Sequence, residues 1–299
     1  MTDLPRRRII IVGAGGRLGA ALAREYQSTF TVVGFNHAQL DLADEPQLRA
    51  TLAACDFDVL VNCAAQTNVD RCETHPQEAF ALNAHAPEVL AEICLAKTAR
   101  LIHISTDYVF DGAKTQPYSE DDEAAPVSAY GESKRAGEQR VLAVNPQNLV
   151  ARVSWVFGPD RPSFVDWVVQ QARTHERVDA VADKFATPSY TLDLADLLRP
   201  LLADFSVGGL LHLANAGQCS WREYGQWALD CCAAEGVPLR TREVGAVSLA
   251  DMKNFIARRP LYSVLATAKY ERVTGRAPRD WREAVSSYVR DYVKPRLPV

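Results

Sequence analysis

The sequence has no apolar run long enough to cross a membrane, and its N-terminus lacks the apolar core of a signal peptide. It contains no Cys-x-x-Cys pair, and its seven cysteines are an odd number. These absences argue against a membrane protein, a secreted disulfide framework and a cysteine-based zinc site. They favour buried thiols in a reducing compartment, so a cytoplasmic protein is expected.

The sequence also lacks an excess of positive charge. It has 33 Lys and Arg against 37 Asp and Glu, a formal net charge of -4. Because no basic face is offered to a phosphate backbone, nucleic acid is not expected as a partner. The one basic cluster, residues 6–8, precedes an apolar run and is interpreted as the solvated start of a strand.

What the sequence does have is a regular alternation of two patterns. Short β-branched apolar runs, typical of buried strands, alternate with amphipathic stretches such as residues 17–27 and 87–96. This order predicts an α/β fold, namely a Rossmann-type doubly wound parallel sheet with helices on both faces. The expected strands are residues 9–12, 31–35, 59–62, 101–105 and 149–153.

The alternation becomes less regular after Gly158. Residues 1–158 are expected to form the NAD(P)-binding Rossmann core. Residues 159–299 are expected to complete the sheet and to supply a smaller, mixed, helix-rich substrate lobe. Helices are predicted over 163–175 and 221–235, and another strand over 210–214. No Pro/Gly/Ser-rich linker separates the halves, so the smaller lobe is expected to be built from segments of the chain that leave the sheet and return to it.

A glycine-rich loop follows the first expected strand and leads into a helix. Glycine there lets the main chain approach a pyrophosphate, whose charge a helix N-terminus stabilises. The loop therefore predicts a dinucleotide site. The expected contacts are Gly13, Gly15, Gly16, Arg17, Leu18 and Gly19.

The end of the second expected strand bears on which dinucleotide binds. NAD-preferring sites place an acidic residue there, whereas this chain has Asn36 and His37. Together with Arg17 these side chains can donate to a 2'-phosphate, so NADPH is favoured, with NADH as the alternative. His37 can equally be a solvent-facing loop residue. Asp41 and Leu42 can meet the adenine, although a helix-capping Asp is the other interpretation of Asp41.

Tyr130 and Lys134 are four residues apart, which on a helix places both on one face. A lysine cation nearby lowers a tyrosine pKa from about 10 and eases proton transfer to a carbonyl oxygen. Ser105 and Thr106 end an expected strand, where ligands bind in such sheets, and either hydroxyl can hydrogen-bond a substrate carbonyl. Turn chemistry is the alternative for both.

These motifs together resemble those of the dTDP-4-dehydrorhamnose reductases, a family of extended short-chain dehydrogenases. The resemblance covers nearly the whole chain. It rests on the stretches Ser105-Thr106-Asp107-Tyr108-Val109-Phe110-Asp111-Gly112, Pro117-Tyr118 and Tyr130-Gly131-Glu132-Ser133-Lys134, on Asn83, and on residues 13–19, 62–70, 152–158, 186–190 and 259–263.

The resemblance implies reduction of the 4-keto group of a dTDP-6-deoxyhexulose by NADPH or NADH, giving dTDP-L-rhamnose. The partner it implies is a nucleotide sugar. Roles transferred by motif are a catalytic triad of Thr106, Tyr130 and Lys134; cofactor contacts from Ala64, Ala65, Gln66, Ser105, Tyr130 and Lys134; and substrate contacts from Thr106, Asp107 and Trp155.

The chain departs from the family pattern at several positions. Tyr262 stands where Asn is usual, and Ala186 where Gly is usual, which bears on the sugar or nucleotide accepted. Ala20-Ala21 replaces the acidic residues through which some members form a magnesium-linked dimer, so no structural metal is expected; a homodimer stays open. Two further interpretations also stay open. One is a non-catalytic NADP-binding regulatory subunit resembling the methionine adenosyltransferase β subunit; the other is a reductase or epimerase of another nucleotide sugar.

Overall fold

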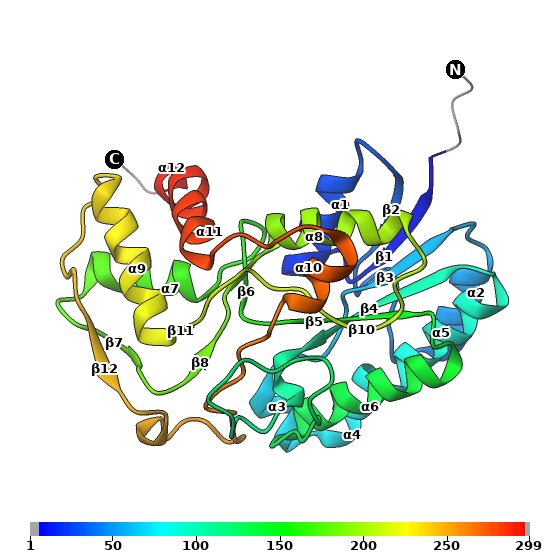
Figure 1. Ribbon diagram of the computed structural model, residues 1–299, viewed down its shortest axis with the longest axis horizontal. Helices are drawn as coiled ribbons and strands as arrows, with labels where there is room; N and C mark the ends of the chain where they lie inside the picture. The colour runs from blue at the N-terminus through cyan, green and yellow to red at the C-terminus, as the bar shows by residue number, and fades with distance from the viewer. Residues whose placement is uncertain (1–5, 297–299) are drawn as a thin grey trace.

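A parallel sheet of six strands, in the order β10-β5-β4-β3-β1-β2, lies at the centre of the computed structural model, which describes residues 6–296 (Figure 1). The Rossmann-type parallel sheet predicted from the sequence is therefore confirmed. Its strands are β1 (Arg8–Val12), β2 (Thr31–Phe35), β3 (Val59–Asn62), β4 (Arg100–Thr106), β5 (Leu149–Val153) and β10 (Gly209–His212).

Helices cover both faces of this sheet because its strands are apolar on both sides. In β1, Ile9 and Ile11 belong to one core, whereas Ile10 and Val12 belong to the other. The first core includes side chains of α1 (Arg17–Tyr26), α8 (Thr191–Ala203) and α10 (Ala268–Thr274). The second includes side chains of α2 (Glu45–Ala53), α5 (Ala86–Ala96) and α6 (Ala129–Val144).

The strand order reverses direction at β1, which lies between β2 and β3. In open parallel sheets, ligands bind beyond the carboxyl ends of the strands at such a switch point. Short elements follow the carboxyl ends of β3 and β4. They are α3 (Val69–Thr74), α4 (Pro76–Phe80), the π-helical turn η1 (Ala81–His85) and the 3-10 turn η2 (Asp107–Val109).

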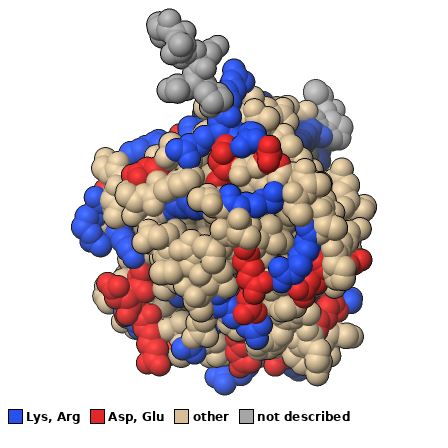
Figure 2. Space-filling model, turned by 90° about the vertical axis from the view of Figure 1, so that its right-hand side faces the viewer, with Lys and Arg blue, Asp and Glu red and all other residues tan. Residues whose placement is uncertain are grey.

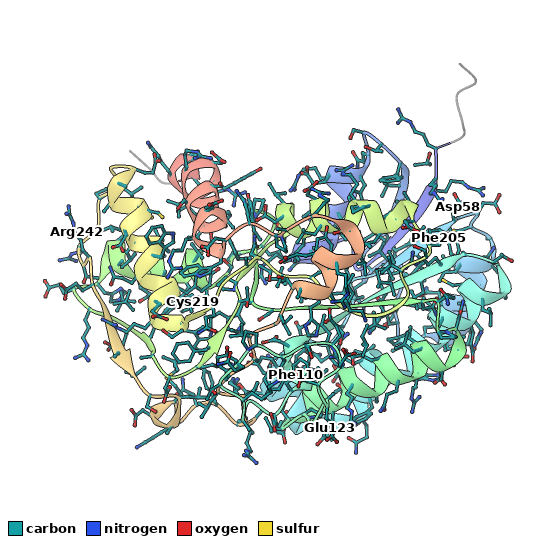
Figure 3. The ribbon with its side chains drawn as sticks, in the orientation of Figure 1. Asp58, Phe110, Glu123, Phe205, Cys219 and Arg242 are labelled. Atoms are coloured by element: carbon teal, nitrogen blue, oxygen red, sulfur yellow. The ribbon has the colours of Figure 1, made fainter. Side chains whose placement is uncertain are left out.

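A second, smaller lobe lies on the left in Figure 1 and has its own apolar core. Cys219, labelled in Figure 3, is buried in it. Its helical elements are α7 (Phe164–Thr174), α9 (Trp221–Ala234), α11 (Trp281–Tyr288) and η4 (Val289–Val293), followed by α12 (Lys294–Arg296). Its strand pairs are β7 (Val178–Val181) with β12 (Val244–Val247), and β8 (Phe185–Ala186) with β11 (Cys219–Ser220); η3 (Leu249–Asp251) follows β12.

The second half of the chain contributes to both parts of the molecule. Strand β10 and helices α8 and α10 complete the sheet and cover it, whereas α7, α9 and α11 build the smaller lobe. A further strand pair consists of β6 (Val156–Phe157) and β9 (Ser189–Tyr190). In the sequence, β6 lies between β5 and α7, and β9 lies between β8 and α8. The mixed, helix-rich second lobe is thus present as predicted, and α8 is a helix that the sequence pattern did not reveal.

The surface carries charges of both signs. On the face shown in Figure 2, Lys and Arg are interspersed with Asp and Glu. In the basic cluster at residues 6–8, Arg8 forms a 3.0 Å salt bridge with Asp56, and the Arg7 guanidinium lies 4.5 Å from the centre of the Phe205 ring.

Two kinds of feature are absent from residues 6–296. No helix there is both long and apolar enough to span a bilayer. Nor do three His, Cys, Asp or Glu side chains come together there in a way that could hold a metal ion.

Candidate active site

A cavity of about 990 Å³ opens at the carboxyl ends of the central strands, at the switch point of the sheet. Its wall combines the glycine loop, the ends of β2, β3 and β4, the start of α6 and the segment after β5. Predicted site residues in this wall are Gly13, Gly15, Gly16, Arg17, Leu18, Asn36, His37, Asp41, Leu42, Ala64, Ala65, Ser105, Thr106, Asp107, Tyr130, Lys134 and Trp155.

The glycine loop forms a cradle that a side chain would fill. Gly13 has a φ of +84°, and a Cβ placed on it would lie 2.7 Å from the backbone nitrogen of Ala64. Gly16 precedes α1 and offers no side-chain cap, so the first N–H groups of the helix are open to an anion. Both features fit the pyrophosphate of a dinucleotide.

Two predicted cofactor residues do not line the cavity. Gly19 lies on α1, where a Cβ would come within 2.2 Å of the Gly13 carbonyl oxygen; it lets the helix approach the loop. The Gln66 amide donates to Glu78 Oε1 (2.9 Å), and its backbone N–H donates to Asn83 Oδ1 (2.8 Å). Gln66 thus holds the segment after β3 in place.

Two arginines connect the glycine loop to the segment after β6. The Arg17 guanidinium donates to the backbone oxygens of Val156 (3.1 Å), Arg161 (3.3 Å) and Pro162 (2.5 Å), and burial lowers its pKa. The Arg161 Nε donates to the Gly15 oxygen (2.7 Å), and this exposed cation also lines the cavity. Sequence reasoning missed Arg161 because no local motif marks it.

The end of β2 carries no carboxylate at residues 34–37. Asn36 Oδ1 accepts a hydrogen bond from the Gln39 backbone N–H (3.2 Å). The His37 side chain is 86% exposed, and its Nδ1 lies 3.7 Å from Asp41 Oδ1. Both predicted phosphate donors therefore stand at the open rim of the cavity, with Asp41 beside them.

Tyr130 is the second residue of α6, and its position depends on the tight start of this helix. The Ser128 hydroxyl accepts a hydrogen bond from the Gly131 N–H, and a Cβ on Gly131 would lie 2.2 Å from the Tyr108 oxygen. The Tyr130 ring packs edge-on against Tyr108, with 5.5 Å between ring centres. Burial raises the pKa of Tyr130, and a hydrogen bond with Thr106 lowers it.

Lys134 lies one turn further along α6 and is almost completely buried. Its Nζ donates to the Ile104 oxygen at 2.7 Å. Burial lowers the pKa of Lys134 to about 8, although Glu138 opposes this. The sequence led us to expect that Lys134 lowers the pKa of Tyr130. The group that lowers the Tyr130 pKa is instead Thr106.

Asp107 is buried where the cavity meets the second lobe. The Ser263 hydroxyl donates to Asp107 Oδ2 (2.5 Å), and the Thr106 hydroxyl donates to Oδ1 (3.2 Å). Burial raises the pKa of Asp107, and the positive charge of Lys184 opposes that rise. Lys184 is itself fully buried, and burial lowers its pKa to about 8. Sequence reasoning assigned no role to Lys184.

Trp155 contributes an aromatic surface to the same end of the cavity. Its φ of +38° is unusual for a residue with a side chain, and such strain is frequent in ligand sites. Within residues 6–296 the buried indole N–H finds no hydrogen-bond acceptor. The strained backbone and the unpartnered donor both suit contact with a bound molecule.

Ser105 lines the cavity, but its hydroxyl donates to Glu138 Oε1 at 2.6 Å. Glu138 also binds Arg152 of β5, whose guanidinium lies 5.0 Å from the ring centre of Phe110, which is labelled in Figure 3. This polar cluster connects α6 to β4 and β5. Ser105 thus has a structural partner on the side of α6.

A doubly wound sheet with a glycine cradle, and a Tyr130/Lys134 pair at the carboxyl ends of its strands, defines an extended short-chain dehydrogenase/reductase. Residues 7–294 match the family model for the RmlD substrate binding domain. The chain belongs to the dTDP-4-dehydrorhamnose reductase family, as its motifs indicated.

Similar proteins agree with this assignment. The dTDP-4-dehydrorhamnose reductase of Mycolicibacterium smegmatis is 39% identical over 96% of this chain and 86% of the relative. A probable dTDP-4,6-dihydroxy-2-methyloxan-3-one 4-ketoreductase of Streptomyces antibioticus is 39% identical over 93% of each chain. The crystal structure of the Bacillus anthracis dTDP-4-dehydrorhamnose reductase in complex with NADP superimposes with a TM-score of 0.89, at 29% identity, over 96% of this chain and 99% of that one.

Proposed function

We propose that this protein reduces the 4-keto group of a dTDP-linked 6-deoxyhexulose to give dTDP-L-rhamnose, with NADPH or NADH as reductant. The observation that carries this proposal is the placement of Tyr130, Thr106 and Asp107 in the same cavity as the glycine cradle. Membership of the reductase family and the activity named for its relatives support it.

The reduced dinucleotide, when bound, supplies a hydride to the carbonyl carbon. The glycine loop would hold its pyrophosphate, and Ala64 and Ala65 would line its path at the end of β3. Lys134 would hold the ribose next to the nicotinamide. Arg161, which adjoins Gly15 at the rim, adds a cation for the phosphates.

The residues of the chain handle the proton. Tyr130 donates its phenolic proton to the carbonyl oxygen as charge develops there, and Thr106 orients that oxygen. Because burial favours the protonated phenol, Tyr130 is a donor at neutral pH. Asp107 accepts hydrogen bonds from sugar hydroxyls, and Trp155 offers its face and its free N–H.

NADPH is the proposed preference. Asn36 and His37 stand at the rim with no carboxylate among residues 34–37 to repel a 2'-phosphate. Arg17 is a weaker candidate for that contact, because backbone oxygens of the segment after β6 already accept its donors. The Bacillus anthracis relative was solved with NADP.

A different 4-keto nucleotide sugar is the second candidate substrate. Ala186 is buried where the family usually has Gly, and the Tyr262 hydroxyl donates to Gln218 Oε1 at 2.7 Å. Both departures lie in the substrate lobe. The Streptomyces antibioticus relative is named as a ketoreductase of another dTDP sugar.

Location and assembly are also proposals. Free thiols at all seven cysteines, each within the described residues, support a cytoplasmic location. A homodimer is a separate proposal, which light scattering of the purified protein tests.

The activity is tested by following the absorbance of NADPH, and separately of NADH, with freshly generated dTDP-4-keto-6-deoxyhexulose and its 3,5-epimerase. Rapid oxidation with dTDP-L-rhamnose as product supports the reductase and ranks the cofactors. Tight NADPH binding without turnover would instead favour a regulatory subunit. In a control without the added 3,5-epimerase, isomerised sugar without net oxidation would favour an epimerase.

A further inference from the structure

A chain of buried polar groups runs beneath the active site, between β3, β4 and α6. Asn62 and His103 are register partners on adjacent strands, and both are fully buried. Asn62 Nδ2 lies 3.1 Å from His103 Nδ1, and His103 Nε2 lies 3.2 Å from Lys134 Nζ. The chain therefore connects the end of β3, beside the glycine cradle, to the catalytic lysine.

The direction of these hydrogen bonds follows from the contact between Ala64 and Asn62. The Ala64 backbone N–H can only donate, and it donates to Asn62 Oδ1 at 3.1 Å. The Asn62 amide must then turn its NH₂ group toward His103, so Nδ1 is an acceptor. Burial lowers the pKa of His103 well below its usual value, so the ring is neutral and its single proton is on Nε2.

That proton faces Lys134. An ammonium at Nζ would place donor against donor at 3.2 Å, whereas a neutral amine accepts the Nε2–H and still donates a proton to the Ile104 oxygen. The Asn62 amide therefore acts on Lys134 through the tautomer of His103.

The other titratable groups around Lys134 do not cancel the effect of His103. Glu138, one turn along α6, would favour the ammonium, but Arg152 of β5 binds its carboxylate twice, at 2.9 and 2.7 Å. Burial raises the pKa of the Cys63 thiol, beyond β3, to about 12, so it carries no charge at neutral pH. Burial also keeps Tyr130 protonated.

We propose that His103 is a positioning residue: oriented by Asn62, it donates its Nε2–H to Lys134, favours the neutral amine, and so sets the pH at which the catalytic lysine gains its charge. This deepens the proposed function and rests on it for the role of Lys134. Burial lowers the pKa of Lys134 to about 8, and the His103 Nε2–H acts in the same direction. Activity that needs the ammonium falls as the pH rises through that value.

The first test is Asn62→Asp, read from the ¹³Cε shift of Lys134 during a pH titration of the protein without substrate. The carboxylate accepts from both Ala64 N–H and His103 Nδ1, which leaves Nε2 as an acceptor for the ammonium. The pKa of Lys134 should rise by about one unit, a tenfold increase in proton affinity. Lys134→Met assigns the signal, and Lys184, whose pKa is also about 8, serves as the internal reference that should not move.

A new carboxylate can also act on Lys134 through its charge alone, and His103→Phe separates the two effects. If the tautomer carries the effect, most of the rise caused by Asn62→Asp disappears in the His103→Phe background. An equal rise in both backgrounds would overturn the proposal, as would a wild-type Lys134 that titrates at its usual value.

His103→Gln is the second variant should Asn62→Asp fail to fold. Its amide can turn an oxygen toward Nζ, so the Lys134 pKa should again rise, and an unchanged value would contradict the proposal. Because the signal is read without substrate, this test fails or succeeds independently of which keto sugar is reduced.

Discussion

Arg152 of β5 forms two hydrogen bonds with Glu138 of α6, at 2.9 and 2.7 Å, inside a site where the two side chains are 2% and 4% exposed. Ser105 of β4 donates to the same carboxylate. The helix that carries Tyr130 and Lys134 is thereby fixed against two strands of the sheet. We attribute the geometry of the Tyr130/Lys134 pair to this connection as much as to apolar packing.

Arg152→Met should destabilise the protein by about 3–5 kcal/mol, because it leaves the Glu138 carboxylate buried without its charged partner. The double variant Arg152→Met/Glu138→Leu should recover most of this loss, since no charge is then left buried. Urea unfolding followed by circular dichroism measures both. A double variant as unstable as the single one would contradict the argument.

Gly13→Ala should weaken dinucleotide binding by about tenfold or more, equivalent to about 1.4 kcal/mol, because its Cβ would collide with Ala64 at the cradle. Gly236→Ala is the matched control. Gly236 has a similar φ of +75°, but a Cβ placed on it would meet no atom of residues 6–296 within 4 Å beyond its immediate chain neighbours. The control should lose stability and keep its affinity, as measured by fluorescence titration with NADPH. Equal affinities would show that the cradle is not the binding site.

Asn36→Asp should change the cofactor preference with little effect on the fold. Aspartate retains the oxygen that accepts from Gln39, but its charge repels a 2'-phosphate and suits a ribose hydroxyl. The KM for NADPH should rise by about tenfold, equivalent to about 1.4 kcal/mol, whereas the KM for NADH stays the same or falls. A parallel change for the two cofactors would place the 2'-phosphate elsewhere.

Lys184→Met should shift the pH dependence of substrate use. The Lys184 charge opposes the rise that burial causes in the Asp107 pKa, so its removal raises that pKa further. In the proposed role of Asp107, substrate binding needs the carboxylate, which is lost as the pH falls through its pKa. The acidic limb of kcat/KM should therefore move to higher pH. Lys184→Arg, which keeps the charge, should move it less. An acidic limb at the same pH in all three proteins would remove Lys184 from this role.

The sequence was sufficient to predict the sheet and most of the cavity wall, because apolar strands and the glycine loop are local patterns. The direction of some side chains can also be predicted from the sequence. Ser105 and His103 are two residues apart on one strand, so both point to the face that α6 covers. That alternation explains why Ser105 reaches Glu138.

Other site features depend on contacts between distant segments and have no local signal. Arg161 meets Gly15 across 146 residues of chain. Lys184 comes into place beside Asp107 only when the second lobe folds onto the sheet. The raised pKa of Tyr130 could not be predicted either, because the Tyr-x-x-x-Lys spacing does not reveal that the phenol is buried.

The central claim is that Tyr130 protonates the carbonyl oxygen during reduction of a dTDP-4-keto sugar. The most direct test is the single-turnover rate of NADPH oxidation by wild type and Tyr130→Phe with that substrate, after binding has been shown to saturate in both. We expect the phenylalanine variant to bind both ligands and to lose about 10²–10⁴-fold in rate, the usual contribution of a general acid. A variant that reduces the sugar at the wild-type rate would contradict the account.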